Sequence, residues 1–98
     1  MSHFSEALRI YPEYMEAHNN LGVVLAKKGR DSEAISHFTE ALRINPGNAG
    51  AHNNLGIALA RNGKTEKAIL HFRQALRIMP DFEWVRNNLE KALLLQGK

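Results

Sequence analysis

Residues 17–22 read AHNNLG, and the same six letters return at residues 51–56, 34 positions further along the chain. Extended in both directions, the match aligns residues 15–48 with residues 49–82 and gives 18 identical positions. A fixed period of this length is the sequence signature of a protein built from stacked repeats. The repeat therefore decides the fold class before any single side chain is considered.

The repeat register continues beyond these two blocks. Residues 1–14 repeat the second half of a block, and residues 83–98 repeat its first half. We therefore predict a single domain over residues 1–98. Its parts are a half repeat (1–14), two full repeats (15–48 and 49–82) and a half repeat or capping helix (83–98).

The composition excludes several classes of protein. The chain has 98 residues, 44% of them hydrophobic, and a net charge of +3, which is typical of a folded domain and not of a disordered chain. It has no cysteine, so disulfides, thiolate metal sites and cysteine catalysis are excluded. No apolar run approaches the roughly 20 residues that a membrane-spanning helix needs. The cytoplasm is the expected compartment, although no residue pattern assigns one.

Each block predicts two helices joined by a short turn, so neighbouring helices should be antiparallel. In the first block, Leu21 and Leu25 recur at helical spacing, and Gly29 ends the first helix. Asp31 is expected to cap the second helix, which Pro46 ends. The corresponding residues of the second block are Gly63, Thr65 and Pro80.

Gly22 and Gly56 fall inside the predicted first helices, where a glycine costs about 1 kcal/mol relative to alanine. A glycine that recurs at such a place indicates the close approach of another helix. We expect Phe38 to contact Gly22, and Phe72 to contact Gly56, within the same block.

These features together resemble the tetratricopeptide repeat: the 34-residue period, the Leu-Gly of the first helix, the Ala…Phe…Ala of the second and the closing proline. The resemblance covers essentially the whole chain. It departs at His18 and His52, where the family pattern favours tryptophan. The resemblance implies an all-α fold, a right-handed α-solenoid of antiparallel helix pairs whose first helices line a concave groove. It also implies binding of a peptide or protein segment. We expect no enzymatic activity and no cofactor, because the sequence has no Gly-rich phosphate loop, His-Glu-x-x-His helix or nucleophile elbow.

Candidate binding residues are those of the first helices that lie outside the packing stripe. Asn20, Asn54 and Asn88, here called the asparagine ladder, come directly before the leucine of each first helix. An amide offers both a donor and an acceptor, which suits a peptide backbone. The ladder is similar to the one in the repeats of O-linked N-acetylglucosamine transferases, where it holds the substrate backbone. The alternative is that these amides bond neighbouring helices or face water. The remaining candidates are Asn19, Val23, Lys27, Asn53, Ile57 and Arg61.

Other kinds of site are not expected. Chaperone adaptors of the resembled family clamp a carboxylate with cations, but Asn19, Val23, Trp84 and Asn88 stand where such residues would be needed. Trp84 either anchors a ligand at the end of the groove or covers the joint below Pro80. Basic residues are interleaved with acidic ones and lie near helix ends, which does not predict nucleic-acid binding, and no membrane partner is predicted.

The histidines recur at the repeat period. Equivalent residues of neighbouring helices lie about 8–10 Å apart, whereas zinc ligands must come within about 2.1 Å of the metal. We therefore predict no metal site from this ladder and no catalytic role. The histidines are His3, His37 and His71 in the second helices, and His18 and His52 in the first.

The expected partner is a protein or peptide, and two alternatives stay open. The chain is either a substrate-presenting segment of a larger enzyme, such as a glycosyltransferase, or a self-assembling scaffold. The terminal helices carry apolar residues without a predicted neighbour, including Leu8, Leu93, Leu94 and Leu95, which favours head-to-tail or swapped self-association. Glu90, at the place of Gly56, favours instead a solvated capping helix.

Overall fold

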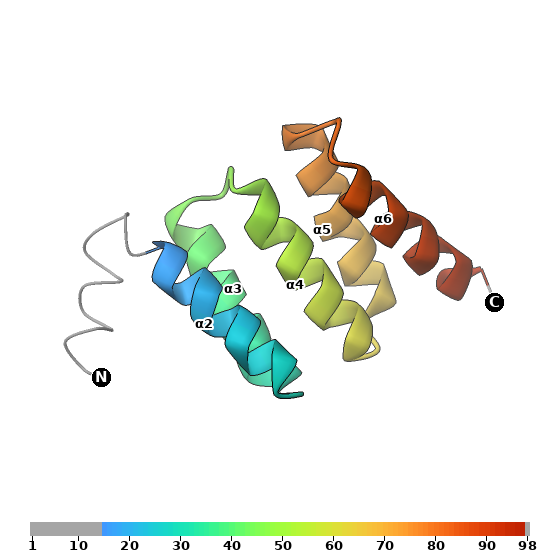
Figure 1. Cartoon of the computed structure of the whole chain (residues 1–98). Coiled ribbons are helices and arrows are strands. Elements are labelled where there is room, and N and C mark those ends of the chain that lie inside the picture. Colours follow the sequence, from blue (N-terminus) through green and yellow to red (C-terminus); the bar gives the residue numbers. More distant parts are fainter. Residues whose placement is uncertain (1–14, 98) are drawn as a thin grey trace.

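A computed structural model describes residues 15–97, and the half repeat predicted for residues 1–14 lies outside this range. The described part contains five helices and no strand, so the all-α prediction is confirmed. Figure 1 shows them packed side by side, each antiparallel to the next along the chain. No helix among them is long and apolar enough to cross a membrane. The helices are α2 (Met15–Lys27), α3 (Asp31–Ile44), α4 (Ala49–Arg61), α5 (Thr65–Ile78) and α6 (Glu83–Gln96).

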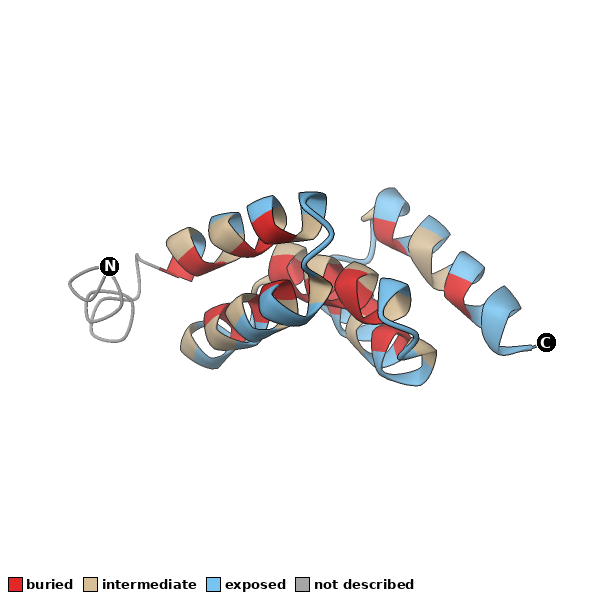
Figure 2. Cartoon of the chain, turned by 90° about the horizontal axis from the view of Figure 1, so that it is seen from below, coloured by how far each residue is buried: buried red, intermediate tan, exposed pale blue. Residues whose placement is uncertain are grey.

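The helices form two layers. The first helices of the repeats, α2, α4 and α6, lie on one side, and the second helices, α3 and α5, lie on the other (Figures 1 and 2). Buried residues face between the layers, as the red segments of Figure 2 show. The arrangement is an α-solenoid of antiparallel helix pairs, because each helix packs mainly against its neighbours in sequence.

Glycine ends the first helix of each pair, as predicted. Gly29 and Gly63 have φ values of +79° and +80°, in the left-handed region that glycine enters without steric cost. The next backbone amide then turns back to a carbonyl of the preceding helix. The N–H of Arg30 donates to the Leu25 carbonyl at 2.9 Å, and that of Lys64 donates to the Leu59 carbonyl at 2.8 Å.

The predicted N-caps are wrong by one position. Asp31 and Thr65 are the first residues of α3 and α5, and no side chain caps either helix. The glycine turn brings the chain into the helix one residue earlier than the sequence pattern suggested. Asp31 still places a negative charge in the first turn, where the helix dipole favours it. The side-chain cap lies at α4 instead, where Asn48 Oδ1 accepts from the Ala51 backbone N–H at 2.8 Å.

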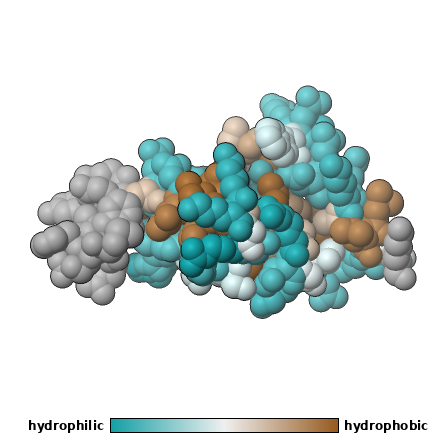
Figure 3. Space-filling model, turned by 60° about the horizontal axis from the view of Figure 1, so that its bottom comes forward, coloured by the Kyte–Doolittle hydropathy of each residue, from teal (hydrophilic) through white to brown (hydrophobic). Residues whose placement is uncertain are grey.

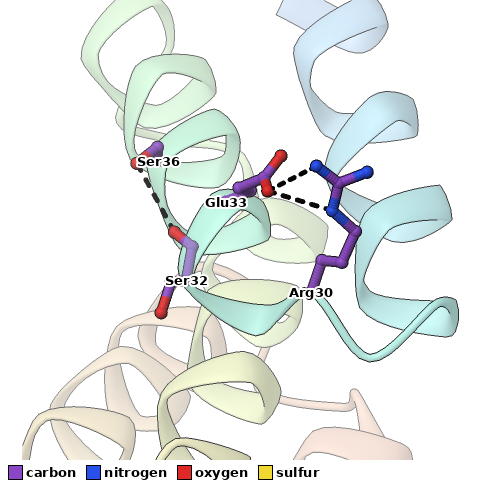
Figure 4. A network of polar contacts seen from close by, with 4 residues as sticks. All are labelled: Arg30, Ser32, Glu33 and Ser36. Atoms are coloured by element: carbon purple, nitrogen blue, oxygen red, sulfur yellow. Dashed lines mark hydrogen bonds and ion pairs between the residues drawn. The ribbon is translucent and has the colours of Figure 1, made fainter.

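A network of exposed polar contacts surrounds the start of α3 (Figure 4). Arg30 donates from Nε and Nη2 to Glu33 Oε1 at 2.9 and 2.6 Å, and the Ser36 hydroxyl donates to the Ser32 carbonyl at 3.5 Å. Because the ion pair is more than half exposed on both sides, it contributes at most about 1 kcal/mol to stability.

The contact between glycine and phenylalanine is confirmed in both repeats. A Cβ atom built on Gly22 would lie 2.5 Å from Cε1 of Phe38, and one built on Gly56 would lie 2.5 Å from Cε1 of Phe72. Both rings are almost fully buried. The missing side chains of the glycines are therefore what allows the two helices of each pair to interlock.

Candidate functional site

The face formed by the first helices carries two apolar pockets. One, of about 310 Å³, lies between α2 and α4 and also takes a side chain from α6. Its floor includes Phe38 of α3, so the ring that fills the space above Gly22 also forms part of the candidate site. The residues that line it are Val23, Ala26, Lys27, Phe38, Asn54, Ile57, Arg61 and Trp84.

The second pocket, of about 250 Å³, lies one repeat further along, between α4 and α6. Most of its lining residues lie 34 positions after a lining residue of the first pocket. Ile57 corresponds to Val23, Phe72 to Phe38 and Asn88 to Asn54. Arg61 and Ile57 line both pockets. The complete lining is Ile57, Ala60, Arg61, Phe72, Asn88, Lys91, Ala92 and Leu95.

The asparagines of neighbouring first helices are hydrogen-bonded to one another. Asn54 Nδ2 donates to Asn19 Oδ1 at 3.1 Å, and Asn88 Nδ2 donates to Asn53 Oδ1 at 3.0 Å. The donor in each pair belongs to the asparagine ladder, and the acceptor precedes the ladder residue of the previous repeat. Both bonds therefore join residues 35 apart, and they fix the side chains of Asn54 and Asn88 at the pocket rims.

The sequence-predicted site residues fall into two groups. Val23, Lys27, Asn54, Ile57, Arg61 and Asn88 line the pockets. Asn19, Asn20 and Asn53 do not line either pocket. Of these, Asn53 is only 6% exposed, Asn19 accepts the bond from Asn54, and Asn20 is exposed on α2.

Trp84 lies at the groove and is 68% exposed. Its side chain lines the pocket formed by α2 and α4, together with Val23 and Ile57. Its place in the pocket lining is compatible with a ligand anchor, and both interpretations left open by the sequence stay predictions. An exposed tryptophan beside an apolar pocket is a common feature of protein-binding surfaces.

Sequence reasoning missed the part that the phenylalanines play in the pockets. The sequence places Phe38 and Phe72 only at the helix interface, but each also lines one pocket. Gly22 and Gly56 could have predicted this role. Because glycine has no side chain, each phenylalanine ring can pass beside the first helix and approach the groove face.

Histidines pair within each repeat. His18 Nδ1 lies 3.1 Å from His37 Nδ1, and His52 Nδ1 lies 3.0 Å from His71 Nδ1. In the second pair His52 Nε2 donates to the Pro46 carbonyl at 2.8 Å, so neutral His52 must accept at Nδ1 from His71. Among residues 15–97 no three metal-binding side chains come together.

Burial lowers the pKa of His18 and of His71 below the ordinary value of 6.5. In His18 the nearby His37 and Arg43 lower the pKa further, while Glu40 opposes them. In His71 the second cause is His52. Both imidazoles are therefore held in the neutral form, in which one ring nitrogen donates and the other accepts.

The folded chain should lose stability as the pH falls below about 6.5. With a lowered pKa in the folded state, His18 and His71 bind protons more readily when unfolded, so acidification favours unfolding. Thermal unfolding followed by circular dichroism between pH 7.5 and 5.5 measures the effect. The variant His18→Gln/His71→Gln should show a shallower dependence, and an equal slope would contradict the assignment to these two residues.

Arg61, at the groove, and Arg43, on the opposite layer, each have an acidic neighbour. Arg61 Nη2 donates to the Ala26 carbonyl at 3.2 Å, and its Nε lies 3.7 Å from Asp31 Oδ2. This guanidinium therefore ties α4 to the end of α2 and the start of α3. On the opposite layer, the hydrogen bond and charge of Glu40 raise the pKa of Arg43, as expected from their neighbouring positions.

The apolar end of α6 is exposed in the described chain. Leu94 is 71% exposed, Leu93 and Leu95 are also exposed, and Figure 3 shows hydrophobic atoms gathered at the C-terminal end of the molecule. The N-terminal residues expected to take part in self-association lie outside residues 15–97. Self-association through the terminal helices therefore stays a prediction.

Comparison with known proteins agrees with this architecture. Residues 15–81 match the sequence pattern of the tetratricopeptide repeat family. No protein of curated function matches the chain by sequence. Among solved structures, a mutant O-GlcNAc transferase of Thermobaculum terrenum superimposes with a TM-score of 0.81 and 31% sequence identity.

That similarity covers 92% of this chain but only 17% of the transferase, so this chain spans a small part of the enzyme's length. The repeat pattern and the family match agree over residues 15–81, which contain helices α2 to α5. The chain belongs to the tetratricopeptide repeat family, whose repeats are non-catalytic modules that in general mediate protein–protein interaction.

Proposed function

We propose that the chain binds an extended protein segment in the groove formed by α2, α4 and α6. The observation that supports this most directly is the pair of apolar pockets at equivalent places in two successive repeats. A largely apolar pocket with a few placed polar groups is typical of binding sites. Two of them in register suit a ligand that runs across the helices.

The asparagine ladder suits the backbone of such a ligand. Each interhelical bond uses one of the two amide N–H groups of Asn54 or Asn88. The second N–H and the carbonyl oxygen of each side chain are then available to a peptide group. Because the existing bond already holds the side chain in place, little rotamer freedom remains to be lost on binding.

A peptide array probed with the wild type and with Asn20→Ala/Asn54→Ala/Asn88→Ala tests the proposal. The wild type should retain a set of peptides, and the triple variant should bind them at least about tenfold more weakly, since each lost backbone contact is worth about 1 kcal/mol. Helicity should stay near that of the wild type. Asn62→Ala, an exposed asparagine at the end of α4, is the matched control and should bind normally.

The melting temperature of the triple variant decides between the two interpretations of the ladder. Loss of Asn88 leaves the buried Oδ1 of Asn53 without its donor, which costs some stability. If the melting temperature of the triple variant falls steeply, the asparagines are structural and the proposal loses its main support. Retained binding by a well-folded triple variant would overturn the proposal.

A second candidate function is supported by the similarity to the transferase. The chain would then be the substrate-presenting segment of a larger glycosyltransferase, in which the same groove holds the protein to be modified. An antibody raised against this chain distinguishes the two in cell extracts. A species near 11.0 kDa supports the separate module, and a much larger species supports the segment of an enzyme.

A further inference from the structure

We infer that the groove selects an acidic segment in the polyproline II conformation that carries two apolar side chains three residues apart. The inference rests on the proposed peptide binding and adds the chemistry of the ligand. Three features of the groove support it: the spacing of the pockets, the sign of the charges around them and the amides at their rims.

The spacing follows from the repeat. One pocket lies between α2 and α4 and the other between α4 and α6, so they are offset by one repeat. Both pockets share Ile57 and Arg61 of α4, so they lie on either side of one helix, whose diameter with its side chains is about 10–12 Å. A polyproline II helix has three residues per turn and rises 3.1 Å per residue, so side chains at i and i+3 lie on one side about 9 Å apart. In a β-strand the same two side chains would point to opposite faces.

Every charged side chain that lines the two pockets is basic. Lys27 and Arg61 line the first pocket, and Arg61 and Lys91 line the second. Asp31 offsets part of the Arg61 charge at 3.7 Å, but Lys27 and Lys91 are exposed and add to the chain's net charge of +3. Carboxylates of a ligand between or beside the apolar anchors would meet these cations, whereas lysines would be repelled.

The conformation also suits the amides. A polyproline II backbone makes no internal hydrogen bonds, so its N–H and C=O groups need partners. Asn54 and Asn88 stand at the rims of the pockets, one repeat apart like the pockets themselves. A ligand whose apolar side chains enter the pockets would therefore bring its backbone past both amides.

Fluorescence anisotropy with three synthetic peptides tests the inference. The first has two leucines three residues apart, with proline and glutamate between and beside them. The second replaces each glutamate by lysine, and the third keeps the composition but places the leucines side by side. The first peptide should bind at least about tenfold more tightly than either of the others. The second peptide loses a few exposed ion pairs, and the third can place only one leucine in a pocket.

Charge reversal on the protein gives the complementary measurement. Lys27→Glu/Lys91→Glu should weaken the acidic peptide about tenfold and favour the lysine peptide. Lys67→Glu/Arg73→Glu makes the same change in charge on exposed positions of α5, outside the groove, and should leave both affinities unchanged apart from a small long-range effect. Circular dichroism confirms that each variant is folded.

Two negative results have different meanings. If the three peptides bind equally, or if both double variants act alike, the inferred ligand chemistry is wrong. The general proposal then still stands, provided that the array detects peptides whose binding depends on the asparagine ladder. If no peptide on the array depends on the ladder, peptide binding in this groove and the ligand chemistry are both overturned.

Discussion

Replacing Gly56 by leucine should lower the free energy of unfolding by about 3 kcal/mol, at the upper end of typical overpacking effects. A Cβ at this position would lie 2.5 and 2.7 Å from two ring carbons of Phe72, far inside the contact distance of about 3.5–4.0 Å. The ring is only 2% exposed, so neighbouring atoms surround it on nearly every side. Helices α4 and α5 must therefore separate to accept the larger side chain.

Chemical and thermal unfolding of the variant measure this loss. For a chain of this size the melting temperature should fall by about 10–20 °C. Ser36→Leu is the control, because the second repeat carries Leu70 at the equivalent exposed place. We expect its effect to stay within about 0.5 kcal/mol. A loss at Gly56 no larger than the loss at Ser36 would contradict the helix contact.

A double variant separates the clash from other effects of the substitution. If Leu at position 56 and Phe72 compete for the same space, Phe72→Ala should cost much less in the Gly56→Leu background than in the wild type. Additive losses would show that the glycine acts through its backbone and not through the ring.

The fold was predictable because the period carries most of the information. The same glycine and phenylalanine recur 34 residues apart, so one local contact predicts two: Gly22 with Phe38, and Gly56 with Phe72. Likewise, the end of the first helix at Gly29 predicts that the corresponding helix of the next repeat ends at Gly63. These features depend on backbone geometry and on the presence or absence of a side chain, both of which follow directly from residue type.

Pairing between side chains was less predictable. A period shows which residues are equivalent, but equivalent residues do not bond one another here. Asn54 reaches Asn19 over 35 positions, and His52 reaches His71 over 19. Both pairings depend on helix rotation and on rotamers, which the 34-residue register does not contain.

Replacing Val85 by aspartate should detach α6 from the rest of the solenoid. Val85 has no exposed surface and occupies in α6 the place of the buried Ala51 in α4. An unpaired carboxylate in that apolar contact costs several kcal/mol, which is a large part of what holds a terminal helix. Because stacked repeats contact mainly their neighbours, we expect α6 to unfold while α2 to α5 keep their structure.

Circular dichroism of the Val85→Asp variant should therefore show the loss of about a fifth of the helical signal from residues 15–97, since α6 contributes 14 of the helical residues in that range. Trp84→Asp is the matched control, since the neighbouring tryptophan is largely exposed and its replacement should leave the helicity unchanged. Full helicity in both variants would contradict the packing of α6.

The same pair of variants connects the fold to the groove. Detaching α6 removes Asn88, Lys91 and Leu95, which form one side of the second pocket, so a ligand that spans both pockets should lose most of its affinity. Trp84→Asp alters only the first pocket, and a folded protein with moderately weaker binding is the expected result. If peptide binding survives the loss of α6 unchanged, the ligand does not cross from α4 to α6, and the groove ends at the first pocket.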